Sequence, residues 1–288
     1  MRPISSHSRP AALFWCRHVT TPRAVAAGLS AAALVAVAAC GSSSAGGSGG
    51  SSLTPRQALA LAASQNQHLT SAVETLTVKV TGAQSETTTG TILIQRKPTL
   101  EISANLSAAA AGRNIQIKEV LTSQAIYFSA PGLTGQLTKK PWVRIPLSAL
   151  QRSTAGASFA QLFHSLQSNN FTNQTEILAV AKNAHLVGKQ TVNGVPTTEY
   201  AGSITASQAL KALSAGFRKS MGSFLRALGN ATINFHIWID GQNQTRRLTE
   251  TESLNGVTVN TTVNITGINQ PVQITVPPAS QITQMPGL

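Results

Sequence analysis

Side chains that could act as nucleophiles, general bases or metal ligands are few in this 288-residue chain, which has two cysteines, six histidines and nine acidic residues. Beyond residue 40, successive histidines are 96, 21 and 51 residues apart, so no two have the spacing of a metal-ligand pair. Beyond residue 52 there is neither a Gly-x-Ser-x-Gly nucleophile motif nor a phosphate-binding glycine loop. We therefore expect no catalytic residue, no metal site and no cofactor.

Three titratable side chains lie in segments that alternate between polar and apolar residues. His236 stands between Phe235 and Ile237, which favours the polar face of a strand. Glu250 and Glu252 share one face of another strand, where we expect them to be solvated. A hydrolase would require a histidine–acid pair that only the folded chain brings together.

Cys40 is the residue best placed for covalent chemistry, because it ends an apolar run and begins a stretch of small polar residues. The run, residues 24–39, follows an arginine-containing segment and is shorter than the roughly 20 residues of a spanning helix. Residues 37–41 read Val-Ala-Ala-Cys-Gly and resemble the bacterial lipobox, whose cysteine receives a diacylglycerol. We expect a signal peptide over 1–39 and lipid attachment at Cys40. An uncleaved membrane-spanning helix is the alternative.

Residues 40–52 combine the lipidated cysteine with a Gly/Ser-rich tether whose random-coil reach is about 20 Å. The expected location is therefore the extracytoplasmic face of the cell membrane, with a lipid anchor. Cleavage removes four arginines and no acidic residue, which lowers the formal net charge from +13 to +9. The remaining basic residues are scattered and form no nucleic-acid-binding motif, so we expect contact with anionic headgroups or plain solubility rather than nucleic acid.

The chain beyond the tether reads as one α+β domain over residues 53–288. Thr54 and Pro55 are a suitable N-cap and first helical residue for a helix over 55–68. Asn193-Gly194 predicts a tight hairpin turn within 185–204. Alternation with a period of two predicts antiparallel strands in one large sheet. The remaining strand segments are 75–82, 89–106, 114–130, 141–147, 232–240, 245–254 and 257–268.

Helical spacing appears again over residues 156–167 and 206–228, each with an apolar stripe. Such stripes serve either as plain core or as the wall of a ligand site. The strands carry slender apolar side chains, which favours a gap between sheet and helices, a usual place for an apolar ligand. The candidate ligand-binding residues on the two stripes are Phe159, Phe163, Leu210, Leu213, Phe217, Met221 and Phe224.

Three segments carry a resemblance to a known family: 126–147 with Lys-Pro-Trp, 187–205 with its Asn-Gly hairpin, and 235–248 with Trp-x-Asp and a later Arg. With the lipobox, they resemble actinobacterial LppX/LprG-type lipoproteins of the LolA-like superfamily of envelope lipid carriers. The resemblance implies a strongly curved half-barrel sheet with helices packed on its concave face, enclosing an apolar cavity for acyl chains. It implies structural roles for the motif residues, which include Pro141, Trp142, Gly194, Tyr200, Trp238 and Asp240.

The resemblance also implies a function, that of a non-enzymatic carrier of lipids or lipoproteins. Acyl chains would contact the helix stripes, led by Phe217, Met221 and Phe224. The expected partners are a lipid or lipidated ligand, the membrane through Cys40, and an envelope transporter or acceptor protein. We expect a monomer. The alternative is an envelope sensor or scaffold that uses the same fold, with a filled core, to bind a protein partner.

Overall fold

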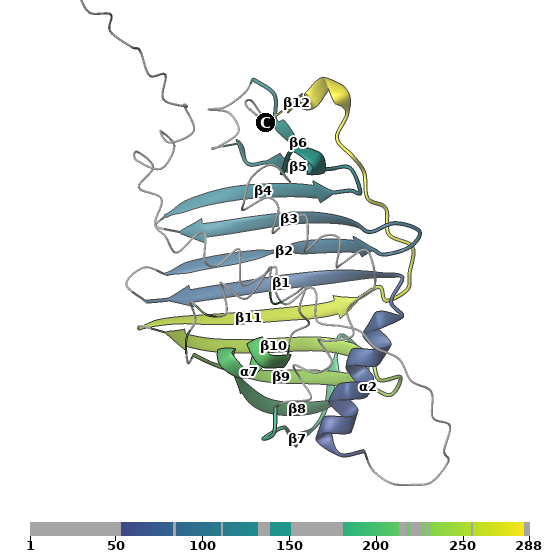
Figure 1. The fold of residues 1–288 in the computed structure, drawn as a ribbon, viewed down its shortest axis with the longest axis vertical. Coiled ribbons are helices and arrows are strands. Elements are labelled where there is room, and N and C mark those ends of the chain that lie inside the picture. The colour runs from purple at the N-terminus through teal and green to yellow at the C-terminus, as the bar shows by residue number, and fades with distance from the viewer. Residues whose placement is uncertain are drawn as a thin grey trace, which may run out of the picture.

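The computed structural model describes residues 53–82, 85–110, 112–131, 139–150, 181–212, 231–254 and 256–284, together with Arg218, Arg226 and Gly229. The expected signal peptide, Cys40, the tether and the helix predicted over 156–167 lie outside these residues. Within them, twelve strands form one open sheet in the order β12-β6-β5-β4-β3-β2-β1-β11-β10-β9-β8-β7 (Figure 1). All neighbours are antiparallel except β12 and β6, so the predicted single, mainly antiparallel sheet is confirmed.

The strands follow the predicted segments closely, although two segments each contain two strands. Segment 89–106 is divided after Gln95, where a turn contains Pro98 and its cis peptide bond, because proline cannot donate to a strand ladder. The strands are β1 (Ser71–Thr81), β2 (Glu86–Gln95), β3 (Glu101–Ala110), β4 (Arg113–Leu121), β5 (Ala125–Ser129), β6 (Trp142–Pro146), β7 (His185–Val192), β8 (Val195–Thr205), β9 (Thr232–Asp240), β10 (Thr245–Leu254), β11 (Val257–Thr266) and β12 (Ile282–Gln284).

Helix α2 (Pro55–Gln67) begins where the sequence predicts. The backbone N–H of Gln57 donates to Thr54 Oγ1 at 3.3 Å, and the Thr54 N–H donates to Gln57 Oε1 at 2.9 Å, which completes a capping box. Both α2 and α7 (Ala206–Ala212) are drawn in front of the sheet in Figure 1. Helix α7 is the first part of the helix predicted over 206–228. The remaining short helices are α4 (Leu147–Leu150) and the 3-10 turn η2 (Ala279–Gln281).

Sheet formation joins the two ends of the domain, because β1 pairs with β11 over nine residue pairs. Leu76 lies opposite Val263 in this pairing, and Val78 lies opposite Thr261. The Asn193-Gly194 turn joins β7 and β8 as predicted, with φ angles of 50° and 79°. The hairpins are thus local, whereas the β1–β11 ladder brings together segments far apart in the sequence.

The two faces of the sheet differ in polarity. In β1, Leu76 and Val78 are buried on the face that packs against Leu59 and Ala62 of α2, and we call this the inner face. The outer face presents mainly threonine, serine and asparagine. It is covered near β4 and β5 by the C-terminal segment, in a small cluster that includes Tyr127 and Ile282. This alternation is the period-two pattern of the sequence.

Two inner-face glycines allow close contacts that a Cβ would block. A Cβ on Gly202 would lie 2.7 Å from the Phe235 ring, which covers this residue from the neighbouring strand. A Cβ on Gly90 would lie 2.6 Å from Leu106 Cδ2. Glycine at these positions therefore lets large apolar side chains pack directly over the backbone.

Candidate functional site

The inner face carries an extended apolar core of the described residues, which reaches over most of the sheet. Its buried core runs from β4 through β3, β1, β11 and β10 to β9. The partly buried side chains that pack against this core come from the same face. Its buried members in the strands are Leu76, Val78, Val80, Leu106, Ile117, Phe235, Ile237, Ile239, Leu248 and Val263.

Of the predicted ligand-binding residues, the structure places only Leu210, which is half-buried in α7. Helix α7 packs against β8. The other candidates lie outside the described residues, and their role stays a prediction: Phe159, Phe163, Leu213, Phe217, Met221 and Phe224. Cys40 also lies outside, so lipid attachment stays a prediction as well.

Sequence reasoning missed that five of the nine acidic residues occupy inner-face positions. Each is in phase with the apolar residues of its own strand, as Glu74 is with Leu76. This shared parity is the signal that could have found them, because residues two apart on a strand point to the same face. The five are Glu74, Glu86, Glu119, Glu250 and Glu252.

Glu74 is the most deeply buried of these acids. It lies between Ile92 of β2 and Ile265 of β11, and its side chain is only 5% exposed. Its Oε2 atom has no hydrogen-bond partner within the described ranges. Burial raises the pKa of Glu74 to about 8, although the positive charge of Arg96 opposes this shift. The carboxyl group is therefore largely protonated at neutral pH.

A second group of acids, which we call the acidic end, lies where β2 starts and β10 ends. Glu86 is 5% exposed. The Thr88 hydroxyl donates to its Oε1 at 3.4 Å, and its Oε2 has no hydrogen-bond partner in the described part of the chain. Burial raises the pKa of Glu250 to about 7, and the neighbouring charge of Glu252 adds to this shift. Burial also raises the pKa of Glu252. Glu250 and Glu252 are half-buried on the apolar strand face, so the expectation that they are solvated is met only in part.

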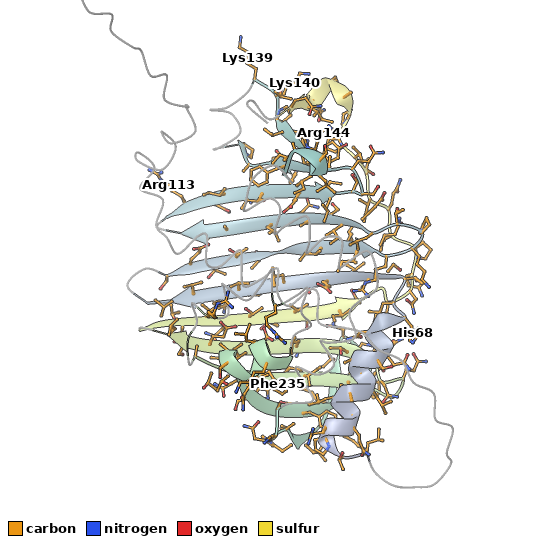
Figure 2. The ribbon with its side chains drawn as sticks, in the orientation of Figure 1. His68, Arg113, Lys139, Lys140, Arg144 and Phe235 are labelled. Carbon is orange, nitrogen blue, oxygen red and sulfur yellow. The ribbon has the colours of Figure 1, made fainter. Side chains whose placement is uncertain are left out.

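Glu119 completes the set on β4, between Ala104 and Phe128 of the adjacent strands. Burial raises the pKa of Glu119. The basic side chains labelled in Figure 2, among them Arg113 and Lys139, lie instead at the periphery of the molecule. Within the described residues, acids thus gather on the inner face of a chain whose formal net charge is positive.

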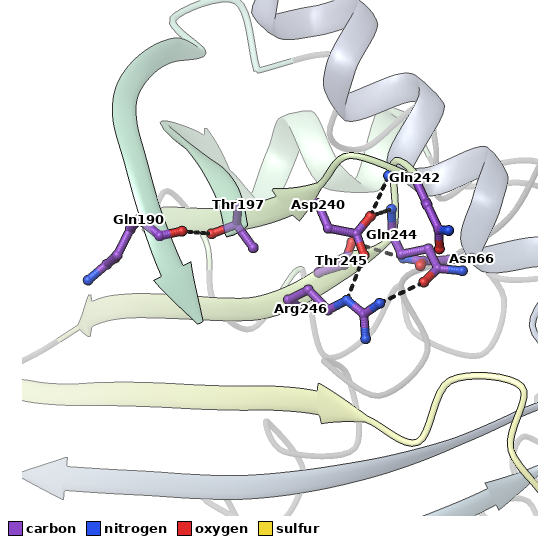
Figure 3. A network of polar contacts seen from close by, with 8 residues as sticks. All are labelled: Asn66, Gln190, Thr197, Asp240, Gln242, Gln244, Thr245 and Arg246. Atoms are coloured by element: carbon purple, nitrogen blue, oxygen red, sulfur yellow. Dashed lines mark hydrogen bonds and ion pairs between the residues drawn. The ribbon is translucent and has the colours of Figure 1, made fainter. Parts of the chain in front are cut away.

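Asp240 has a structural role in the turn between β9 and β10. Its Oδ1 accepts hydrogen bonds from the N–H groups of Gln242 and Gln244 at 2.8 and 2.9 Å, and its Oδ2 accepts one from Arg246 Nε at 2.7 Å (Figure 3). Asn243 adopts a φ of 58° in the same turn. The Trp-x-Asp motif with its later arginine is therefore a turn-stabilising motif.

Among the described residues, the fold creates one histidine–acid pair, on the outer face. His236 Nδ1 lies 2.7 Å from Glu199 Oε1, and the His236 ring stacks on Trp238 with centroids 6.0 Å apart. His236 is exposed, which confirms its predicted place on the polar face. A hydrolase needs a hydroxyl or thiol on the other ring nitrogen. Among the hydrogen bonds between described residues, the only partner of the His236 ring is Glu199.

Two further searches cover only the described part of the chain. Within it, no three histidine, cysteine or acidic side chains are grouped so that they could hold a metal ion. No helix there is both long and apolar enough to cross a membrane.

No protein-family model and no curated protein matches this sequence, whereas solved structures do. The lipoprotein LppX of Mycobacterium tuberculosis is 15% identical with a TM-score of 0.45, over 77% of this chain and 98% of LppX. LprF of Mycobacterium bovis is 12% identical with a TM-score of 0.47, over 77% and 96%. A LolA superfamily protein from Nitrosomonas europaea is 9% identical with a TM-score of 0.21, over 77% and 96%. The chain is thus similar in structure to LppX and LprF, at low sequence identity.

Proposed function

We propose that this protein is a lipid-anchored envelope lipoprotein that binds acyl chains against the inner face of its sheet and carries a lipid or lipidated ligand. The observation that supports this most is the continuous apolar inner face, which runs across β4 to β9 and is backed by a polar outer face. Covering an acyl chain with such a surface is favourable by roughly 0.8 kcal/mol per methylene, so a long chain needs no charged contact to be held.

The proposed anchor is a diacylglycerol on Cys40, followed by the Gly/Ser-rich tether. A tether with a reach of about 20 Å holds the domain close to the bilayer surface without embedding it. A lipid that leaves the bilayer would then have a short path to the inner face. This arrangement suits extraction and delivery of lipids at the extracytoplasmic side of the cell membrane.

Purification of the full chain from membranes, followed by native mass spectrometry, tests lipid binding. We expect one co-purifying lipid species per chain, which organic extraction removes. Ile92→Asn places an amide on the half-buried inner face of β2 and is expected to reduce the lipid-bound fraction. Thr91→Asn changes the neighbouring residue on the outer face and is the matched control. Absence of bound lipid, or equal loss in both folded variants, would contradict the proposal.

A second candidate function is that of a scaffold that binds a protein partner. The observation that favours it is β7, which forms one edge of the sheet and exposes Leu186 (58%) and Val187 (49%). An open edge strand can accept a further strand from another chain. This candidate predicts that Val187→Lys abolishes partner binding in the lipid-free protein and leaves the lipid-bound fraction unchanged.

A further inference from the structure

We propose that the acidic end of the inner face is a head-group subsite for a cationic amphiphile, with Glu86, Glu250 and Glu252 facing an ammonium group. The inference rests on the proposed function and names the chemical class of the ligand. The apolar centre of the inner face takes the acyl chain, and the acidic end takes the positively charged head.

The strand register places the three carboxyl groups at one end of the inner face. Glu252 lies opposite Val259, Val259 lies opposite Val80, and Val80 lies opposite Glu86. The two acids at the ends of this row are three strand spacings apart, about 14 Å along the sheet. Glu250 is two residues from Glu252 on the same face, about 7 Å between Cα atoms. The row thus has apolar residues in the middle and acids on both sides.

Glu86 provides an observation independent of the two acids on β10. It comes from β2, is 5% exposed, and directs its carboxyl group to the same face. Among the described residues, its Oε2 has no hydrogen-bond partner, and its Oε1 accepts only the long hydrogen bond from Thr88. A buried carboxyl oxygen without a partner costs free energy in the unliganded protein. A ligand that donates a hydrogen bond to this atom would remove that cost.

The described strands offer these acids little positive charge. Val78 and Thr261 share the row of Glu250, and β9 contributes Ile233 and Phe235. The row of Glu86 continues through Ala110 of β3 to Arg113, the first residue of β4. Arg113 is exposed and lies two strands from Glu86 (Figure 2). Helix α7 carries Lys211, which is also exposed, but packs on β8, two strands from β10.

These surroundings favour an ammonium head over a hydroxyl or a phosphate. Glu250 and Glu252, two residues apart on one strand face, repel each other when they ionise, and a cation offsets this repulsion, whereas a hydroxyl does not. An ammonium group also donates hydrogen bonds, and Glu86 Oε2 can accept one. An anionic head would add to the repulsion. The basic net charge of the whole chain opposes a bound cation, so any preference for one has to arise locally.

Binding of three amphiphiles to the purified full chain tests the inference: hexadecylamine, hexadecanol and palmitic acid, which share one chain length. Displacement of a fluorescent fatty-chain probe measures their affinities. At pH 8 the amine is expected to bind about tenfold more tightly than the alcohol, and the acid more weakly than both. At pH 5 the carboxyl group of Glu250 is largely protonated, because its pKa is about 7. The amine's advantage is then expected to shrink.

The triple variant Glu86→Gln, Glu250→Gln and Glu252→Gln is expected to lose the preference for the amine and to keep its affinity for the alcohol. Retained alcohol binding shows that the isosteric glutamines preserve the fold. Glu101→Gln, on the outer face of β3, is the matched control and is expected to keep the preference.

Equal binding of all three amphiphiles by the wild type, or an amine preference that survives the triple variant, would overturn the subsite and leave the proposed carrier function standing. If none of the three binds, both the subsite and the carrier function fail. Loss of the preference in the triple variant alone supports the subsite.

Discussion

Replacement of Glu74 by glutamine is expected to stabilise the protein, and the gain should grow with pH. The pKa of Glu74 is raised from 4.5 to about 8 because its carboxyl group is buried between Ile92 and Ile265. Between these pH values the folded chain holds a proton that the unfolded chain releases, so stability falls as pH rises. The contribution of the Glu74 carboxyl group to folding stability is fully present below pH 4.5 and is lost as the pH rises towards 8. Glutamine at this position is uncharged at every pH.

The size of the stability gain follows from the shift in the pKa of Glu74. Each pKa unit corresponds to 1.36 kcal/mol, so the full penalty at high pH is about 5 kcal/mol. pH 7 is about one unit below the pKa of Glu74 in the folded protein. At this pH, Glu74→Gln is expected to raise the free energy of unfolding by about 3 kcal/mol. Glu250, whose pKa is raised to about 7, has the same sign of pH dependence. The free energy of unfolding of Glu74→Gln should therefore fall less steeply with pH than that of the wild type. It should still depend on pH, because Glu250 remains.

Urea unfolding at pH 5, 6, 7 and 8, followed by tryptophan fluorescence, measures this difference. The free energy of unfolding of the wild type should fall with pH relative to that of Glu74→Gln, at constant m-value. The matched control Glu101→Gln lies on the outer face of β3 and should stay within about 0.5 kcal/mol of the wild type. Parallel stability curves for Glu74→Gln and the wild type would refute the account of Glu74 as a buried, protonated acid.

Three further changes test other parts of the structure. Cys40→Ala should move the protein from the membrane fraction to the soluble fraction in cell fractionation; retention in the membrane would instead identify the uncleaved apolar segment as the anchor. Gly202→Ala should destabilise the fold by about 1–3 kcal/mol in urea unfolding, because its Cβ would meet the Phe235 ring; unchanged stability would argue against this close contact. Asp240→Asn should cost about 2–4 kcal/mol, because it breaks the ion pair to the partly buried Arg246 and weakens the β9–β10 turn; a cost below 0.5 kcal/mol in the same assay would show that the turn does not depend on it.

Local features of the fold could be predicted from the sequence because their causes are local. The capping box of α2 needs only Thr54 and Gln57, and the β7–β8 hairpin needs only Asn193 and Gly194. Alternation of apolar and polar residues gave most strand positions. The order of the strands could not be derived in this way, because the β1–β11 ladder joins residues almost 200 positions apart in the chain.

Most of the expected ligand-binding residues remain a prediction, and the acids of the inner face were not predicted. Six of the seven expected ligand-binding residues lie outside the described part of the chain, and Leu210 is placed in α7 as expected for that helix. The inner-face acids were missed because burial of a strand residue depends on which strands lie beside it. Glu250 and Glu252 share the face of Leu248 on β10, which the sequence pattern indicates, but their burial also depends on the flanking strands β9 and β11, which that pattern does not specify.

Photo-crosslinking with a lipid that carries a diazirine near the end of its acyl chain tests lipid binding to the inner face most directly. Peptide mass spectrometry of the irradiated full chain should find the label on inner-face residues of the central strands, such as Leu76, Val78 and Val263. The adjacent outer-face residues of β1, Thr75 and Thr77, serve as internal controls and should remain unlabelled. Labelling confined to the outer face, or no labelling at all, would contradict the proposal that this sheet holds acyl chains.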